Sequence, residues 1–130
     1  MTQTRLATVA NLRRHLVDRD YNVTAGFAEL AGHLATDPTI RTILLKTGHG
    51  RPLSAAFLWL RIADRLAGQP RAEALGLAAT FAFTGGNPGI TATLINRADI
   101  AARRDHVASP AILTLLKADH RVREHLAVAV

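Results

Sequence analysis

The fold is decided by residues 70–105, which read PRAEALGLAATFAFTGGNPGITATLINRADIAARRD. Two helical stretches flank a glycine-rich turn at 85–89, and the first of them carries no charge after Glu73. Small residues, which allow neighbouring helices to approach closely, recur along that first stretch at Ala74, Gly76, Ala78, Ala79 and Ala82. The larger leucine and phenylalanine side chains fill the space around them. This pattern predicts two helices packed as a hairpin.

Five prolines divide the chain into segments of similar length: Pro38, Pro52, Pro70, Pro88 and Pro110. Proline suits the first helical position because its missing N–H would be unpaired there, and it pushes the preceding residue out of helical geometry. We therefore expect each proline to open a helix. Asp37, Asn87 and Ser109 each precede a proline and are residue types that cap helix N-termini.

Apolar residues at helical spacing predict further helices at about 5–19, 24–35 and 52–67. The helix at 52–67 is apolar on two sides, which predicts packing between neighbours. Side chains expected to face inward include Leu6, Val17, Leu53, Phe57, Ile90 and Leu115. Whether residues 118 and 119 interrupt the last helical stretch is left open. No segment alternates like a strand.

These observations predict one all-α domain over residues 1–130. We expect seven or eight short helices in antiparallel hairpins, arranged either as a tetratricopeptide-like fold or as an irregular helical bundle. The large aromatic residues expected at its centre are Trp59, Phe81 and Phe83.

Composition excludes several classes of protein. The chain has no cysteine, so it has no disulfide, thiolate metal site or cysteine nucleophile. An amphipathic pattern follows the N-terminus where a signal peptide would be apolar, and the turn at 85–89 breaks the longest charge-free run. We expect a soluble, cytoplasmic protein without a membrane span.

The charge is basic, with a net value of +6 and 14 arginines against 2 lysines. Two interpretations stay open. Arginine clusters at Arg13 and Arg14, and at Arg97, Arg103 and Arg104, are candidate partner-binding residues. A GC-rich genome also raises arginine over lysine and fills helices with alanine, and the spread of the charge along the chain favours this second interpretation.

No motif predicts catalysis, a metal or another cofactor. Ser54 and Ser109 lie at expected helix starts, and neither has the surroundings of a serine nucleophile. The six histidines lack ligand spacing, since His120 and His125 point about 140° apart on a helix. No acid lies clearly on an apolar face, so we expect no raised pKa. The polar loop Gly48–Pro52 is the candidate small-ligand site, through His49 and Arg51.

Residues 72–105 resemble a tetratricopeptide-type helical hairpin. The first helix carries Leu75, Ala79 and the run Phe81-Ala82-Phe83, the turn is Gly86-Asn87, and Ala98 is the small packing residue of the second helix. The chain departs from that pattern in having one recognisable repeat and Thr91 where alanine is usual. An extended superhelix needs several repeats, so the resemblance implies a local hairpin alone.

Residues 30–116 resemble, more broadly, the C-terminal helical region of an actinobacterial family of unknown function. The similarity rests on residues 36–41 (TDPTIR), 58–59 (LW), 72–87 and 109–111 (SPA). These are packing and turn residues, so the resemblance implies a helical fold and an actinobacterial source, and no activity.

The leading hypothesis for function is a non-catalytic protein-interaction module, since hairpin stacking leaves grooves that suit peptides or helices. Its partner is another protein or a second copy of the chain. The alternative is a small basic nucleic-acid-binding protein that uses the arginine clusters. A further alternative is a small-ligand binder or enzyme that uses the Gly48–Pro52 loop.

Overall fold

The computed structural model describes residues 2–129, and side chains as far as residue 126. These residues form eight α-helices and no strand, which confirms the all-α prediction. The helices are α1 (Gln3–Asp18), α2 (Ala25–Ala35), α3 (Arg41–Thr47), α4 (Pro52–Ala63), α5 (Gly68–Thr84), α6 (Pro88–Arg104), α7 (Ile112–Ala118) and α8 (His120–Ala129). The question left open at 118–119 is settled, because Asp119 has extended backbone and separates α7 from α8.

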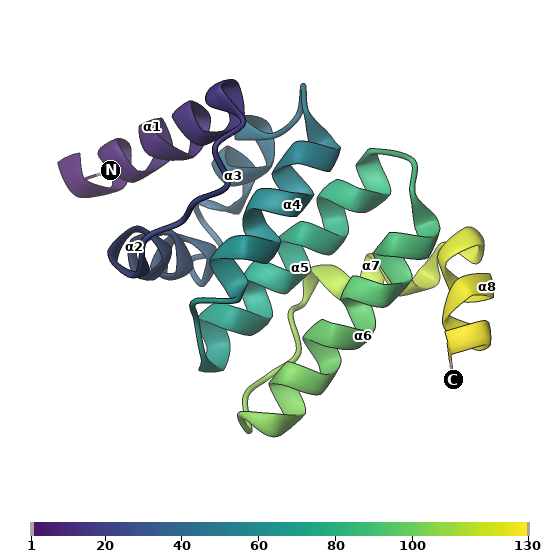
Figure 1. Cartoon of the computed structure of the whole chain (residues 1–130). Helices are drawn as coiled ribbons and strands as arrows, with labels where there is room; N and C mark the ends of the chain where they lie inside the picture. The colour runs from purple at the N-terminus through teal and green to yellow at the C-terminus, as the bar shows by residue number, and fades with distance from the viewer. Residues whose placement is uncertain (1, 130) are drawn as a thin grey trace.

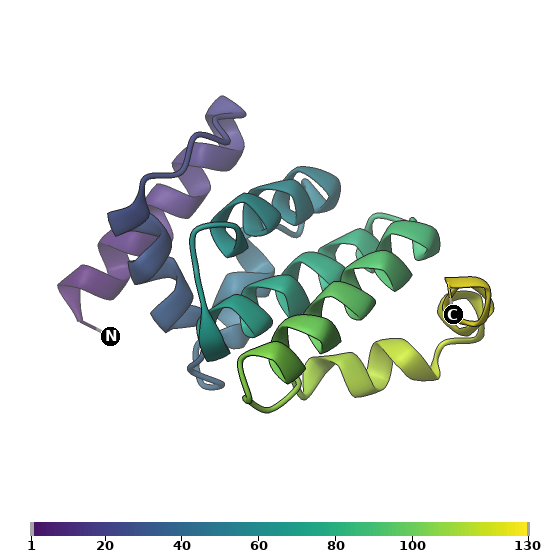
Figure 2. The same ribbon diagram turned by 60° about the horizontal axis from the view of Figure 1, so that its bottom comes forward.

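Helix α5 lies at the centre of the bundle, with α4 on one side and α6 on the other (Figure 1). Helices α1–α3 pack together on the α4 side of the bundle. Helices α7 and α8 pack on the opposite side, against α5 and α6 (Figure 2). The small residues of α5 permit this crowding. A Cβ on Gly76 would lie 3.1 Å from Cβ of Pro110 and 3.2 Å from Cγ2 of Ile112. The hairpin predicted at 70–105 is the pair α5 and α6; its tetratricopeptide-like character stays a prediction.

The α5–α6 turn is closed by its own backbone. Asn87 N–H donates to the carbonyl of Ala82, and Gly86 N–H donates to that of Phe83, each at 3.0 Å. Gly86 has a φ of 78°, the left-handed geometry that this type of helix end requires. Asn87 then caps α6 by accepting from Ile90 N–H at 3.0 Å. This cap confirms the prediction made for Asn87.

Two of the five prolines open helices as predicted, because Pro52 and Pro88 are the first residues of α4 and α6. Pro38 lies in a turn three residues before α3, since Asp37 Oδ1 accepts from Thr39 N–H and holds that turn. Pro70 is the third residue of α5, and Pro110 lies two residues before α7. The side chain of Ser109 caps no helix; it donates to Asp99.

One cluster of buried side chains runs from Val9 to Val122. Trp59 and Phe81 are 1% and 2% exposed and lie in it as predicted. Phe83 is only half-buried, and the guanidinium of Arg121 stands 5.2 Å from its ring centroid. The prediction of a single domain over 1–130 is compatible with one such cluster.

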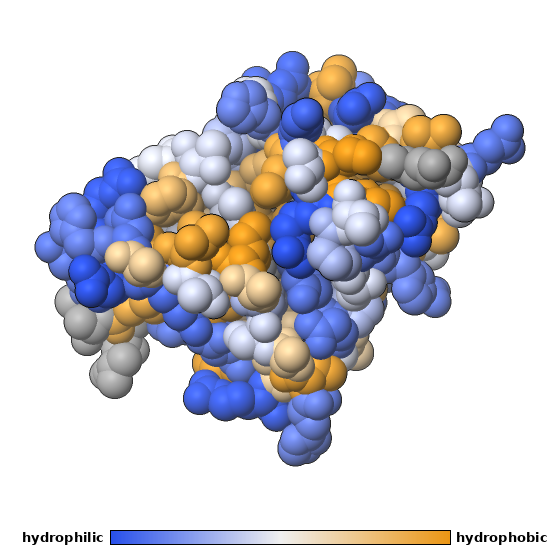
Figure 3. All heavy atoms as spheres, turned by 180° about the vertical axis from the view of Figure 1, so that it is seen from behind, coloured by the Kyte–Doolittle hydropathy of each residue, from blue (hydrophilic) through white to orange (hydrophobic). Residues whose placement is uncertain are grey.

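Several side chains expected to face inward are exposed: Leu6, Val17, Leu53, Phe57, Ile90 and Leu115. The inward face of α1 carries Val9 and Leu16, as predicted, together with Thr8, Leu12 and His15. Helix α4 is buried mainly on its Trp59 side. Seen from the side opposite to Figure 1, apolar side chains lie in several patches among hydrophilic ones (Figure 3). On this face the apolar side chains do not form one continuous patch.

Candidate functional site

A groove runs over the N-terminal half of α5, between the end of α4 and the second half of α6. It consists of two hollows of about 160 and 210 Å³ that share Arg71, Leu75 and Arg97. We call it the α5 groove. Its remaining lining residues are Ala63, Asp64, Leu66, Ile100, Ala101 and Arg104. Three arginines therefore converge on one surface depression.

Helix α6 supplies the wall of the groove through a regular stripe. Arg97, Ile100, Ala101 and Arg104 are spaced i, i+3, i+4 and i+7, which places them on one face of a helix. Ala101 is buried at the base of this stripe, whereas Ile100 is 46% exposed between the two arginines. Arg71 comes from the first turns of α5, so α5 and α6 both contribute positive charge.

The three groove arginines are held to different degrees. Arg71 donates from Nε to the carbonyl of Leu66 at 2.8 Å and lies 3.9 Å from Asp105, so it is fixed from two sides. Arg97 Nη2 lies 3.6 Å from Asp64, and both side chains are about half exposed. Arg104 forms no ion pair within the described residues. Positive charge therefore exceeds negative charge along the groove.

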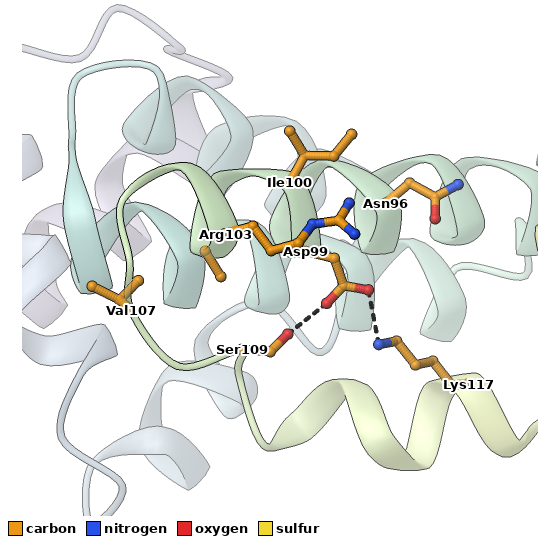
Figure 4. Close-up of a pocket in the computed structure, with 8 residues that line it drawn as sticks. Asn96, Asp99, Ile100, Arg103, Val107, Ser109 and Lys117 are labelled. Atoms are coloured by element: carbon orange, nitrogen blue, oxygen red, sulfur yellow. Dashed lines mark hydrogen bonds and ion pairs between the residues drawn. The ribbon is translucent and has the colours of Figure 1, made fainter.

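A second depression of about 700 Å³ lies on the other side of α6, against the loop to α7 (Figure 4). We call it the α6–α7 cleft. Asp99 stands at its centre, where Lys117 Nζ contacts one carboxylate oxygen at 2.8 Å and Ser109 donates to the other. Arg103 adds a further positive charge to the lining. The groove and the cleft meet at Ile100, which lines both.

The arrangement in the cleft serves binding and packing better than catalysis. Burial alone would raise the pKa of Asp99, but the hydrogen bonds from Lys117 and Ser109 outweigh it and the pKa lies below its ordinary value. A carboxylate with a lowered pKa is a weak base towards the Ser109 hydroxyl. Within the described residues, no three histidine or acidic side chains come together as a metal site.

The structure brings together three of the five arginines predicted to bind a partner. Arg97, Arg103 and Arg104 all lie on the second half of α6, around Ile100. Arg13 and Arg14 lie on α1, which packs against α2, α3 and α4. The arginines therefore form two separate basic regions.

Arg14 has a local role on α1. Its guanidinium lies 3.5 Å from Asp18 and 3.4 Å from Asp20, and Nη2 is 3.2 Å from Nε2 of the buried His15. His15 Nδ1 in turn lies 2.7 Å from the carbonyl of Asp20, which is geometry for an Nδ1–H donor. These contacts close the C-terminal end of α1.

The Gly48–Pro52 loop places its two candidate residues differently. His49 is exposed, and Arg51 lines an open depression of about 360 Å³ together with Arg19 and Leu53. Arg51 Nη1 donates to the carbonyls of Leu16 and Val17 at 2.9 and 3.3 Å. It therefore satisfies the last turn of α1, and its role as a ligand contact stays a prediction.

Replacing Arg51 by glutamine tests its role at the last turn of α1. We expect R51Q to lower the free energy of unfolding by about 1–2 kcal/mol, because a charged donor to terminal carbonyls is lost. Urea unfolding followed by circular dichroism measures the change. Arg13, exposed on α1, provides the control substitution R13Q, which should change stability by less than about 0.5 kcal/mol. Equal stability of R51Q and R13Q would contradict this role.

Glu73 corrects the expectation that no acid has a raised pKa. Burial raises the pKa of Glu73, and the hydrogen bond from Gln69 and the charge of Arg41 offset only part of that effect. The side chain is 13% exposed and its carboxylate lies 3.6 Å from Arg41 Nη2. The residue is on α5, outside the lining of the α5 groove.

This raised pKa gives stability a defined pH dependence. The folded state holds the Glu73 proton more tightly than the unfolded chain, so Glu73 loses its favourable contribution as pH rises through the folded pKa. We expect E73Q to be more stable than the parent at pH 7, by on the order of 0.5 kcal/mol for a partly solvated carboxyl.

The advantage of E73Q should disappear below the ordinary glutamate pKa of 4.5, where the parent is protonated in both states. Melting temperatures measured from about pH 4 to 8 test this. The exposed Glu29 supplies the control substitution E29Q, which should give no such trend. An advantage of E73Q that does not change with pH would refute the assignment.

Sequence reasoning missed Arg71 and Asp64 as parts of the groove. Both lie next to the α4–α5 connection, 26 or more positions before Arg97 in the chain, and only the packing of α4, α5 and α6 brings them together. The available signal was the spacing of Arg97 and Arg104 on one helical face, which pointed to an arginine surface without revealing its opposite wall.

No known protein-family model matches the chain, and no curated protein or solved structure is significantly similar to it. The similarity to an actinobacterial family thus stays a resemblance. Within the described residues, no helix has the length and apolar character required to cross a membrane.

Proposed function

We propose that the chain is a non-catalytic protein-interaction module that binds a partner through the α5 groove. The observation that carries the proposal is the convergence of Arg71, Arg97 and Arg104 on one depression that is open at the surface. Guanidinium groups form paired hydrogen bonds to carboxylates and are enriched at protein interfaces. Ile100 adds an exposed apolar contact between two of them.

Nucleic-acid binding is the alternative, and the distribution of charge argues against it. The α1 arginines and the α6 arginines lie in separate regions, so they do not build one stripe for a phosphate backbone. Asp64 and Asp99 also stand among the α6 arginines. A small-ligand function at Gly48–Pro52 is weaker, because Arg51 is engaged with α1.

Site-specific photocrosslinking tests the proposal. Benzoylphenylalanine placed at position 100, in the groove, should give a discrete adduct with another protein in cells that express the chain naturally. The same group at position 115, where Leu115 is 79% exposed on α7, serves as the control and should give no such adduct. Absence of a protein adduct at position 100, or an adduct with nucleic acid, would refute the proposal.

A further inference from the structure

The spacing of charges along the α5 groove defines what fits it. Arg97 and Arg104 are seven residues apart on α6, which is about 10.5 Å along a helix at 1.5 Å per residue. Ile100 lies between them on the same face. A second helix laid along the groove repeats the same rise, so acidic residues seven positions apart on it would meet both arginines.

We infer that the α5 groove binds an acidic helical segment of a partner protein. Two carboxylates of that segment pair with Arg97 and Arg104, and an apolar side chain between them lies on Ile100. This inference rests on the proposed function, and it adds the chemistry of the partner. The mode is that of an amphipathic helix in a groove.

Charge complementarity supports this occupant. Three arginines and one aspartate line the groove, and Asp105 lies 3.9 Å from Arg71 beside it, so a net positive charge remains to attract an anionic segment. The single ion pair that occupies Arg97, with Asp64 at 3.6 Å, is about half exposed on both sides and therefore weak. A partner carboxylate replaces it at little cost. Arg104 forms no ion pair with any described residue and needs no rearrangement.

The groove is divided into two small hollows of about 160 and 210 Å³. Each hollow has room for one side chain of a polypeptide. The hollows adjoin at the three lining residues that they share, so neighbouring side chains of one segment can occupy both. Such a surface takes successive side chains from one face of a helix.

The groove lining does not suit a nucleic acid. None of the described residues that line the groove is aromatic, so bases have no ring on which to stack. The apolar floor formed by Leu75, which is 2% exposed, matches a side chain better than a sugar or a base.

Fluorescence anisotropy with a designed peptide tests the inference. The probe is a fluorescein-labelled helical peptide with two glutamates seven positions apart and a leucine three positions after the first. We expect binding at about 50 mM salt that weakens at about 300 mM, since exposed ion pairs are screened. The double variant R97Q/R104Q should weaken binding by about tenfold.

The matched control is R13Q/R19Q, which removes the same charge from α1 and its C-cap residue. Arg13 and Arg19 are exposed and form no ion pair within the described residues. We expect this control to weaken peptide binding by less than about twofold, because salt largely screens the attraction between the peptide and arginines outside the groove. An equal loss in both double variants would show that net charge alone attracts the peptide, and would overturn the inference.

A charge swap gives the decisive comparison. R97E/R104E should lose the glutamate peptide and gain a peptide in which lysines replace both glutamates. Failure of the swap overturns the inference, as does groove-dependent preference for a single-stranded oligonucleotide of matched charge. If the glutamate peptide does not bind at all, the inference fails by itself, because crosslinking at position 100 decides the interaction function separately.

Discussion

Replacing Trp59 by alanine is expected to remove about 3–5 kcal/mol from the free energy of unfolding, the range for truncating a buried tryptophan or phenylalanine. Trp59 lies on α4, is 1% exposed, and is the largest of the fully buried side chains. The loss combines buried apolar surface with a cavity that helices α4 and α5 close only in part. A domain of this kind has a total stability of roughly 5–15 kcal/mol, so the substitution removes a large fraction of it.

The measurement is urea unfolding followed by circular dichroism at the helical band, because Trp59 is the one tryptophan and its fluorescence is lost in W59A. F57A is the matched control on the same helix. Phe57 is 47% exposed and meets Tyr21 edge-on at 4.8 Å, so its truncation should cost about 0.5–1.5 kcal/mol.

Equal losses in W59A and F57A would contradict the placement of Trp59 in the core. If W59A does not fold, W59F is measured in its place. W59F leaves a smaller cavity than W59A. It should lower the free energy of unfolding by about 1–3 kcal/mol, which is more than F57A lowers it. A W59F protein as stable as the parent would carry the same contradiction.

The type of fold could be predicted from the sequence because local signals agreed with each other. Helical spacing, prolines at Pro52 and Pro88, and the Asn87 cap all mark helices that the structure contains. Pro38 and Pro110 were displaced from helix starts for a physical reason. Asp37 bonds Thr39 and Ser109 bonds Asp99, so the side chains expected to cap helices build turns or cross-links instead.

The orientation of helix faces was harder to predict, because periodicity shows that a helix has an apolar side without showing how many neighbours cover it. Helix α4 is apolar on two sides, yet Leu53 and Phe57 remain exposed. On α1 the prediction placed Val17 inward, whereas the buried His15 is satisfied by a backbone carbonyl and an arginine. A hydrophobic pattern contains no information about such hydrogen-bond partners.

The candidate site could be predicted only in part. Two of the three groove arginines, Arg97 and Arg104, were singled out from the sequence, because clustered charge is visible on α6. The groove itself depends on α5 being recessed between α4 and α6, with Leu75 as the floor and Arg71 beside it. That arrangement follows from the tight packing of small α5 residues, which is a tertiary property.

Replacing Gly48 by alanine is expected to destabilise the protein by about 1–3 kcal/mol, although the residue begins a polar loop. Gly48 is buried at the end of α3, and its φ of −102° is available to any residue. The obstacle is space. A Cβ there would lie 2.5 Å from Cβ of Ala55 and 2.6 Å from Cε1 of Phe81. Both neighbours are core side chains on packed helices, so the backbone must shift.

Gly50 supplies the opposite result two residues further along. It is exposed, and a Cβ there would meet nothing within 4 Å. G50A should therefore stabilise the protein by about 0.4–1 kcal/mol, because alanine restricts the unfolded chain. Thermal or urea unfolding of the two variants decides the matter. Changes of the same sign would contradict the packing of the 48–52 loop against Phe81. Opposite signs would show that Gly48 packs this loop against the core, while His49 and Gly50 stay at the surface.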